Sequence, residues 1–234
     1  MGVAILALRR AVKSLGRQMG GDQVSPRLLF LPGAGADPTF WRPLADRLPA
    51  DWTKVHFGWP GLGHQPADPA VNGIGDLVAM VEAQLTDQPS DLLAQSMGGA
   101  VAIAVTLRNP GRVRRLVLAT TSGGIDVAGL GGSDWRATYR ANYPDAAAWI
   151  GDERPDYTPA IPTITQPTLL LWGDADPISP VAVGQRLLAL LPNARLEIVA
   201  GGDHGFVEDR PGEIAGWITQ HLSQASVARG AAIG

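Results

Sequence analysis

The sequence predicts an α/β fold in which helices cover both faces of a mostly parallel sheet. Short apolar runs alternate along the chain with longer segments of helical periodicity, which is the order of βαβ units. Runs such as Thr168–Trp172 are apolar at almost every position, as expected for parallel strands buried on both faces. The 234 residues suffice for one such domain with a large core.

The expected elements follow one another in strict alternation over most of the chain. Strands are predicted at 27–32, 53–57, 90–95, 113–119, 167–172 and 195–200. Helices are predicted at 39–48, 74–86, 97–108, 178–191 and 211–222. The breaker Asn109-Pro-Gly111 ends the helix at 97–108. Residues 121–166 interrupt the alternation with glycine clusters, then Trp135, Tyr139, Tyr143 and Trp149, then a proline-rich exit, and long loops of this kind tend to be functional lids. These aromatic side chains either line a substrate pocket or pack the segment onto the domain.

The composition limits the classes of partner and site. A net charge of −3 argues against nucleic acid as a partner, and the chain has no cysteine for disulfides or thiolate metal sites. The His and carboxylate residues show no metal-binding spacing, so we expect neither a metal nor a cofactor. No stretch approaches the 18 or so apolar residues of a membrane span, and the missing targeting signals make the cytoplasm the default location.

The amino terminus is expected to be an extension of the domain, over residues 1–26. Ile5, Leu8, Val12 and Leu15 have helical spacing, and basic residues follow the apolar start, which reverses the charge order of a signal peptide. The pattern predicts a short amphipathic helix with a basic face. We favour packing on the domain or disorder over a membrane-surface role for it. Residues 223–234 are predicted to form a carboxyl-terminal tail.

The strongest chemical signal is the run Asp91-Leu-Leu-Ala-Gln-Ser-Met-Gly-Gly-Ala100. A short apolar strand ends in Ser96, and small residues follow at once. A serine in this position lies on a tight strand-to-helix turn, with its hydroxyl at the carboxyl edge of the sheet. Gly98 and Gly99 leave room for the turn and for a close helix start. The pattern predicts a nucleophile elbow, with Ala94 where the G-x-S-x-G motif has its first glycine.

An acid and a histidine follow this serine in the required order. The apolar strand at 167–172 runs into a turn that carries Asp174 and Asp176, and a Gly-rich loop after strand 195–200 carries His204. A serine hydroxyl needs a base to become nucleophilic, and an imidazole titrates near the working pH. A carboxylate fixes the tautomer of that imidazole. The interpretation is Ser96 as nucleophile and His204 as base, with one of the two aspartates as the orienting acid.

The chain order Ser96, Asp176, His204 resembles that of the α/β-hydrolase superfamily, over roughly residues 27–222. The family's Gly-x-x-Asp pattern, counted from Gly173, ends on Asp176 and therefore favours it over Asp174. The resemblance implies an α/β-hydrolase fold with a short cap of two or three small helices inserted at about 121–166, here called the cap segment. The antiparallel hairpin with which the family usually begins is not found in residues 1–26.

The resemblance also assigns the groups around the triad. The N–H of Met97 follows the nucleophile and would be one oxyanion donor. The second would be the N–H of Ala34, since Pro32-Gly-Ala34 stands where many members have His-Gly-x. His64 lies on a loop that the family places near the active-site mouth, which makes it an alternative substrate contact. The candidate substrate-binding residues are Trp41, Trp135 and Phe206. The remaining histidines, His56 and His221, are expected to be structural or solvated.

The predicted reaction is hydrolysis of a small-molecule carboxylic ester or thioester through an acyl-serine intermediate. Carbon–carbon bond hydrolases and menaquinone-pathway lyases share this triad and remain alternatives. The opening Leu31–Leu48 looks like that of type II thioesterases, which remove acyl groups from carrier proteins. A ligand sensor that retains the hydrolase fold is an alternative of another class, and very low turnover would distinguish it. The expected partner is a small-molecule substrate, and the sequence makes no prediction of oligomeric state.

Overall fold

A computed structural model describes residues 25–152 and 155–224 of the chain. Its centre is a six-stranded sheet in the order β2-β1-β3-β4-β5-β6, and every pair of neighbouring strands is parallel. The structure confirms the predicted α/β class. The amphipathic helix expected at 1–26 and most of the tail expected at 223–234 lie outside the described residues.

The six strands lie within one residue of their predicted positions. Their bounds are β1 Arg27–Leu31, β2 Thr53–His56, β3 Ser90–Gln95, β4 Val113–Ala119, β5 Thr168–Gly173 and β6 Ala194–Val199. The central strands β3 and β5 are buried at every position, because helices cover both faces of the sheet.

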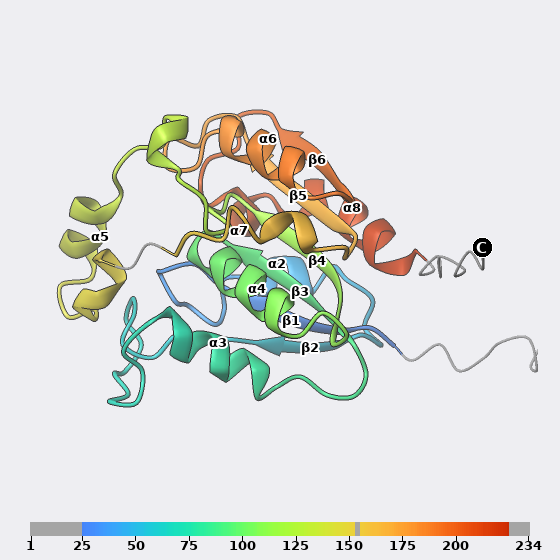
Figure 1. Cartoon of the computed structure of the whole chain (residues 1–234), viewed down its shortest axis with the longest axis horizontal. Coiled ribbons are helices and arrows are strands. Elements are labelled where there is room, and N and C mark those ends of the chain that lie inside the picture. Colours follow the sequence, from blue (N-terminus) through green and yellow to red (C-terminus); the bar gives the residue numbers. More distant parts are fainter. Residues whose placement is uncertain (1–24, 153–154, 225–234) are drawn as a thin grey trace, which may run out of the picture.

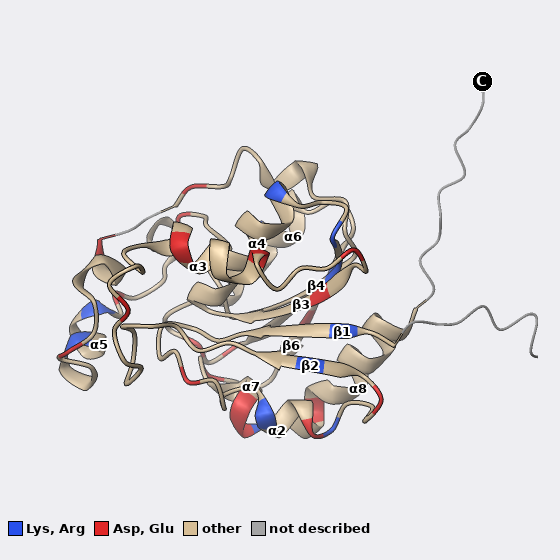
Figure 2. Ribbon diagram, turned by 90° about the horizontal axis from the view of Figure 1, so that it is seen from below, with Lys and Arg blue, Asp and Glu red and all other residues tan. Residues whose placement is uncertain are grey.

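Two helical layers cover the sheet (Figure 1, Figure 2). One layer contains α3 Ile74–Glu82, α4 Met97–Arg108 and α6 Val181–Leu190. The other contains α2 Arg42–Ala45, α7 Phe206–Asp209 and α8 Pro211–Ser223. Figure 2 shows Lys and Arg interspersed with Asp and Glu over both layers.

The alternation of side chains along β1 divides the core in two. Leu29 and Leu31 pack into a cluster with α3, α4 and α6, whereas Leu28 and Phe30 pack into a cluster with α2, α7 and α8. All four side chains are fully buried. Complete burial of one such side chain contributes roughly 1.5–3 kcal/mol of transfer free energy. The two clusters therefore hold β1, and with it the end of the strand, in a fixed position.

The helices differ from the prediction mainly at their ends. The helix expected at 39–48 is only four residues long. Residues 37–41 form turns, and Pro43 lacks the N–H that would bond the Thr39 carbonyl in a helix begun at residue 39. The helix expected to reach residue 86 ends at Glu82, and the next residues form tighter i→i+3 bonds such as that from Gln84 N–H to the Val81 carbonyl. The short helix α7 was not predicted.

The cap segment is almost free of regular helix. Its described residues, 121–152 and 155–166, form one α-helix, α5 Arg136–Asn142, and three 3₁₀ turns at η1 Ala128–Leu130, η2 Ala148–Gly151 and η3 Ile161–Thr163. Figure 1 shows α5 at the end of the sheet opposite to the end at which the described chain begins and finishes. The carboxyl ends of the strands, the expected position of an active site, therefore face the cap segment.

Candidate active site

Ser96 occupies the turn between β3 and α4 in an unusual backbone conformation. Its φ of 52° and ψ of −123° lie outside the regions that non-glycine residues prefer. Two glycines allow the sharp turn: a β-carbon at Gly98 would lie 2.5 Å from the carbonyl oxygens of Leu31 and Pro32, and one at Gly99 would overlap the Thr121 side chain. The small residues after the serine are therefore required by close packing, as the elbow prediction supposed.

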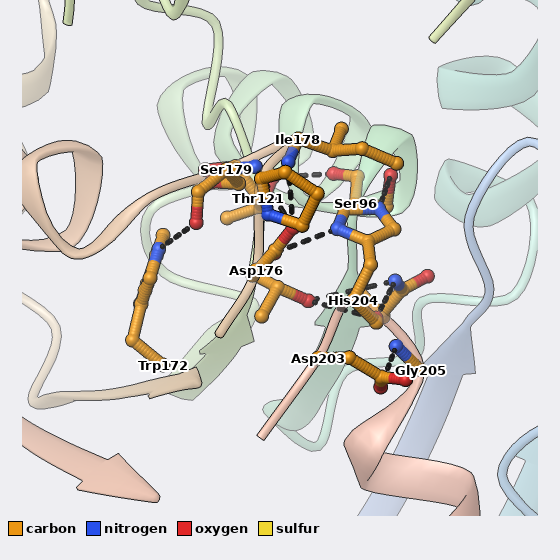
Figure 3. A network of polar contacts seen from close by, with 12 residues as sticks. Ser96, Thr121, Trp172, Asp176, Ile178, Ser179, Asp203, His204 and Gly205 are labelled. Atoms are coloured by element: carbon orange, nitrogen blue, oxygen red, sulfur yellow. Dashed lines mark hydrogen bonds and ion pairs between the residues drawn. The ribbon is translucent and has the colours of Figure 1, made fainter. Parts of the chain in front are cut away.

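The side chains of Ser96, His204 and Asp176 form one hydrogen-bonded chain (Figure 3). The His204 Nε2 atom lies 2.9 Å from the Ser96 Oγ atom, and the His204 Nδ1 atom lies 2.8 Å from Asp176 Oδ2. The Asp176 side chain is fully buried, while 24% of the His204 side chain is exposed. An imidazole in this position can take a proton from the hydroxyl while the buried carboxylate accepts its other N–H.

The second carboxylate oxygen of Asp176 fixes the acid in place. Asp176 Oδ1 accepts the backbone N–H groups of Ile178 and Ser179 at 2.8 and 3.1 Å. The Ser179 carbonyl in turn accepts the indole N–H of Trp172 at 2.9 Å. Asp174, the competing acid, is exposed and instead accepts the N–H of Gly201 at 2.5 Å. The geometry therefore favours Asp176 as the partner of His204.

Similarity to known proteins agrees with this geometry. The sequence pattern of the alpha/beta hydrolase family matches residues 28–217. This chain belongs to the alpha/beta hydrolase family. The family resemblance and fold predicted from the sequence are thereby confirmed.

Three curated relatives illustrate the range of proteins to which this chain is similar. It is 32% identical to a pimeloyl-[acyl-carrier protein] methyl ester esterase of Neisseria meningitidis, over 65% of this chain and 56% of the relative. It is 27% identical to polyketide synthase ThaQ of Burkholderia thailandensis, over 76% of this chain and 11% of the synthase. It is also 27% identical to a 2-hydroxy-6-oxononadienedioate/2-hydroxy-6-oxononatrienedioate hydrolase of Cupriavidus pinatubonensis, over 73% and 78% of the two chains.

The chain thus spans about half of the Neisseria esterase and a small part of the synthase. Among solved structures, a hydrolase from Pseudomonas aeruginosa PA01 superimposes with a TM-score of 0.69 at 20% identity, over 87% of this chain and 92% of that one. This likeness concerns the fold alone.

The two oxyanion candidates both lie close to Ser96. Met97 is the first residue of α4, so its N–H has no acceptor within the helix. Ala34 lies in the turn Gly33–Ala36, which directly follows Pro32 at the end of β1. A β-carbon at Gly33 would be 2.9 Å from the Ser96 β-carbon, which shows how closely this turn approaches the nucleophile.

The candidate substrate-binding residues do not gather in one place. Trp41 and Phe206 belong to the hydrophobic cluster of α2, α7 and α8, and each is only 1% exposed. The Trp41 indole N–H donates to the Leu31 carbonyl at 3.2 Å. These positions correct the prediction, because a side chain buried in this way packs the core and offers no surface to a substrate. Trp135 lies on the cap segment, half-buried, with its ring edge-to-face against Tyr139.

The other histidines occupy three different environments. His56 stacks on Phe30 with ring centroids 4.6 Å apart, and burial lowers the pKa of its imidazole. His221 is buried, and its Nε2 atom lies 3.0 Å from the Leu116 carbonyl oxygen. His64 is exposed and contacts the Tyr143 ring edge-on at 4.8 Å. The first two are structural, as expected, and His64 lies against the cap segment.

Two polar side chains that the sequence analysis did not single out hold the histidine loop. The Gln95 side-chain amide donates to the His204 carbonyl at 2.9 Å, and the Thr120 hydroxyl donates to the same oxygen at 3.3 Å. Both residues stand at strand ends, at β3 and just after β4. Polar residues at the ends of adjacent parallel strands were the signal that could have identified them.

Two further properties concern the described residues alone. In that part of the chain, no three His, Cys, Asp or Glu side chains are grouped so that they could hold a metal ion. None of the described helices is long and apolar enough to cross a membrane.

Proposed function

We propose that this protein is a serine hydrolase that cleaves a small-molecule carboxylic ester or thioester through an acyl-serine intermediate. The observation that supports it most directly is the hydrogen-bonded chain from Ser96 Oγ through His204 to Asp176. The proposal assigns Ser96 as the nucleophile, His204 as the general base and then general acid, and Asp176 as the group that orients the imidazole and stabilises its charged form.

The acylation step follows from these positions. Ser96 Oγ attacks the carbonyl carbon of the substrate while His204 Nε2 accepts the hydroxyl proton. The carbonyl π bond opens to an oxyanion, which accepts hydrogen bonds from the N–H groups of Met97 and Ala34. The amino terminus of α4 adds a favourable dipole. The oxyanion then collapses, the leaving alkoxide or thiolate takes the proton from His204, and the acyl group remains on Ser96.

Deacylation repeats the same chemistry with water. His204 removes a proton from a water molecule that attacks the acyl carbon, and the second oxyanion uses the same donors. Its collapse returns the proton to Ser96 Oγ and releases the carboxylic acid. Because 24% of the His204 side chain is exposed, water has access to the base.

Esters and thioesters are favoured as substrates by two of the relatives. The name of the Neisseria relative describes a methyl ester carried on an acyl-carrier protein, and the other is part of a polyketide synthase. We carry over to this chain only the bond class, an acyl group linked to oxygen or sulfur. Substrate chain length is left to measurement.

The decisive experiment compares wild type with Ser96→Ala on nitrophenyl esters and acyl-thioesters of two to twelve carbons. We expect a rate with a clear chain-length optimum, reduced roughly 10⁴-fold or more by the substitution. Ser133→Ala is a matched control, because Ser133 is exposed and its hydroxyl donates only to the Pro177 carbonyl. A rate that is absent, or that survives Ser96→Ala, would refute the proposal.

Carbon–carbon hydrolysis is the second candidate, and the name of the Cupriavidus relative favours it. The attacked carbon is again an acyl carbon, but the leaving group is a stabilised carbanion that must be protonated at carbon. Loss of the dienoate absorbance of a 2-hydroxy-6-oxodienoate measures this activity directly. A Ser96-dependent rate on that compound, with none on esters or thioesters, would replace the first proposal with the second.

A further inference from the structure

The two proposed oxyanion donors have different supports. Met97 is fixed by a twelve-residue helix, whereas Ala34 lies in a four-residue turn closed by the bond from Ala36 N–H to the Gly33 carbonyl, 3.0 Å long. Ala34 and the exposed Gly35 are the central residues of this turn. The Ala34 N–H belongs to the Gly33–Ala34 peptide, and the next peptide, Ala34–Gly35, can take opposite orientations, as turn types I and II show. A contact that fixes the Ala34–Gly35 peptide therefore fixes the conformation of the turn that carries the Ala34 donor.

A single hydroxyl group provides this contact. The Tyr139 hydroxyl, on α5 of the cap segment, donates to the Ala34 carbonyl at 2.8 Å. The same oxygen accepts the backbone N–H of Gly63 at 3.0 Å. Because a phenol has one proton, these two partners define the direction of each bond. Tyr139 is only 8% exposed, and its burial raises the pKa of the phenol, which keeps that proton in place.

The loop that contains Gly63 also packs against the turn. Gly63 has a φ of +54°, and a β-carbon there would overlap the Gly35 carbonyl. The loop is also bonded to the cap segment, through the Ala147 N–H and the Gly61 carbonyl at 2.7 Å. The turn also packs against the end of β3, where a β-carbon at Gly33 would overlap the Gln95 side chain. The turn is held between the strand and the Tyr139 hydroxyl.

The Tyr139 ring itself has a fixed position. It lies edge-to-face against Trp135, with centroids 5.4 Å apart, and tilted against Tyr143 at 4.9 Å. Its hydroxyl can therefore be removed while the ring remains packed between its neighbours.

We propose that Tyr139 is a positioning residue of the oxyanion hole: its hydroxyl holds the turn through the Ala34 carbonyl and so keeps the Ala34 N–H in place for the reacting carbonyl oxygen. The inference rests on the proposed function, since it concerns the oxyanion formed during acyl transfer. It gives the cap segment a part in catalysis that differs from substrate binding, because α5 acts through the turn and need not touch the substrate.

The test is Tyr139→Phe, with Tyr143→Phe as matched control. Both remove a phenol hydroxyl, one from the middle of α5 and one from its C-cap residue, but the Tyr143 hydroxyl has no hydrogen-bond partner among the described residues. A preorganised donor contributes a factor of about 10²–10³ to kcat, so a misaligned one should cost roughly 10- to 100-fold. We expect this loss in kcat for Tyr139→Phe, with KM changed by less than about twofold, and nearly unchanged kinetics for the control.

A second measurement separates positioning from folding. An alkyl trifluoromethyl ketone forms a tetrahedral adduct with the serine and places its oxyanion in the hole, whereas the alcohol of equal chain length does not. Tyr139→Phe should weaken binding of the ketone by the same 10- to 100-fold factor and leave binding of the alcohol unchanged. Circular dichroism and a thermal melt define a temperature at which all variants are folded.

The possible results lead to different conclusions. If wild type shows Ser96-dependent turnover but folded Tyr139→Phe matches Tyr143→Phe in kcat and in ketone affinity, the inference about Tyr139 is wrong and the proposed function stands. The inference is also wrong if ketone and alcohol weaken equally, because that result indicates a packing role. If wild type has no Ser96-dependent turnover and forms no ketone adduct, the proposed function and this inference fail together.

Discussion

Ser96 shows how a single residue can be held in a conformation that its own side chain disfavours. A non-glycine residue at φ 52° and ψ −123° stores on the order of 1–3 kcal/mol of strain. Three hydrogen bonds retain it: its N–H donates to the Ala119 carbonyl at 3.1 Å, and its carbonyl accepts from Gly99 N–H at 3.0 Å and from the Thr121 hydroxyl. These bonds to the sheet and to α4 offset the strain, and the resulting backbone conformation directs the Ser96 hydroxyl at His204.

At the same scale, Asp176→Asn should abolish most of the activity with little change in structure. The amide oxygen can still accept the N–H groups of Ile178 and Ser179, but the amide nitrogen then faces His204 Nδ1. A donor there forces the imidazole proton onto Nε2, which can no longer accept the Ser96 proton. The equivalent change in a serine protease lowers kcat about 10⁴-fold, and we expect a similar loss in ester turnover.

The control for this substitution lies two residues away. Asp174→Asn changes the same atoms on the same turn, but Asp174 bonds Gly201 and is exposed. We expect activity within about twofold of wild type and a stability change inside the roughly 0.5 kcal/mol typical of surface sites. If Asp174→Asn inactivates the enzyme and Asp176→Asn does not, the acid has been assigned to the wrong residue.

Single residues also mark the limit of prediction from sequence. Ser96, Asp176 and His204 could be proposed because chain order and turn chemistry leave a local pattern around each. The Tyr139 hydroxyl has no such pattern, since its partners stand 105 and 76 positions away. Trp41 and Phe206 were wrongly predicted to bind substrate, because an aromatic residue near a motif looks the same whether it faces the pocket or the core.

At the scale of elements, α4 is placed by its contact with β1. The backbone of Gly98 packs directly on the carbonyls of Leu31 and Pro32, so the helix approaches the strand more closely than any side chain would permit. This approach brings the amino terminus of α4, with Met97, next to the turn that carries Ala34. The helix contact thus sets the distance between the two proposed oxyanion donors.

Gly98→Ala should therefore reduce both stability and activity. The new β-carbon would lie 2.5 Å from two backbone oxygens that cannot move freely, and overpacking of this kind costs about 1–3 kcal/mol. Urea denaturation would show the loss, and kcat should fall because the elbow shifts. Gly216→Ala is the control: this residue is exposed within α8, nothing lies within 4 Å of its added carbon, and the gain in helix propensity should stabilise by about 0.5–1 kcal/mol. If Gly98→Ala stabilised the domain as much as Gly216→Ala, the close contact of Gly98 with the Leu31 and Pro32 carbonyls would be contradicted.

The strands were easier to predict than the cap segment for a physical reason. A strand buried on both faces is apolar throughout, so β5 could be located within one residue from its composition. Residues 121–166 contain short 3₁₀ turns stabilised by contacts with distant loops, such as the bond from Ala147 to Gly61. Helical periodicity is recognised over windows of about 11–18 residues, and α5 has only seven residues.

At the scale of the whole molecule, the two ends of the sheet carry different functions. The proposed triad lies at the carboxyl ends of the strands, whereas a partly buried ion pair between Asp91 and Arg114 lies towards the amino ends. Burial raises the pKa of the Asp91 carboxyl, and the hydrogen bonds from Arg114 act against that rise. Arg114 also donates to the Leu222 carbonyl of α8, so the pair joins the sheet to the last helix. Substitutions at this end of the sheet should lower the free energy of unfolding more than they lower kcat.

His221 makes the stability of the whole domain depend on pH. The residue lies on α8 and is 3% exposed. The pKa of its imidazole is lowered from 6.5 to about 4, and burial is the largest cause of this shift. Above pH 6.5 the residue is neutral in both states and has no effect on the pH dependence. Between pH 6.5 and 4 the unfolded chain binds a proton that the folded domain does not, so the free energy of unfolding falls as the pH falls.

His221→Gln should remove this part of the acid sensitivity. Glutamine does not titrate and can still donate a hydrogen bond towards the Leu116 carbonyl. At about 1.4 kcal/mol per pKa unit, wild type should lose about 3 kcal/mol between pH 7 and pH 4 through this residue. Urea denaturation of both proteins at about pH 7, 5.5 and 4 measures it, because the contributions of Asp91 and other groups cancel in the difference. Parallel curves for the two proteins would show that His221 is protonated at its ordinary pH, and that water reaches the interface between α8 and the sheet.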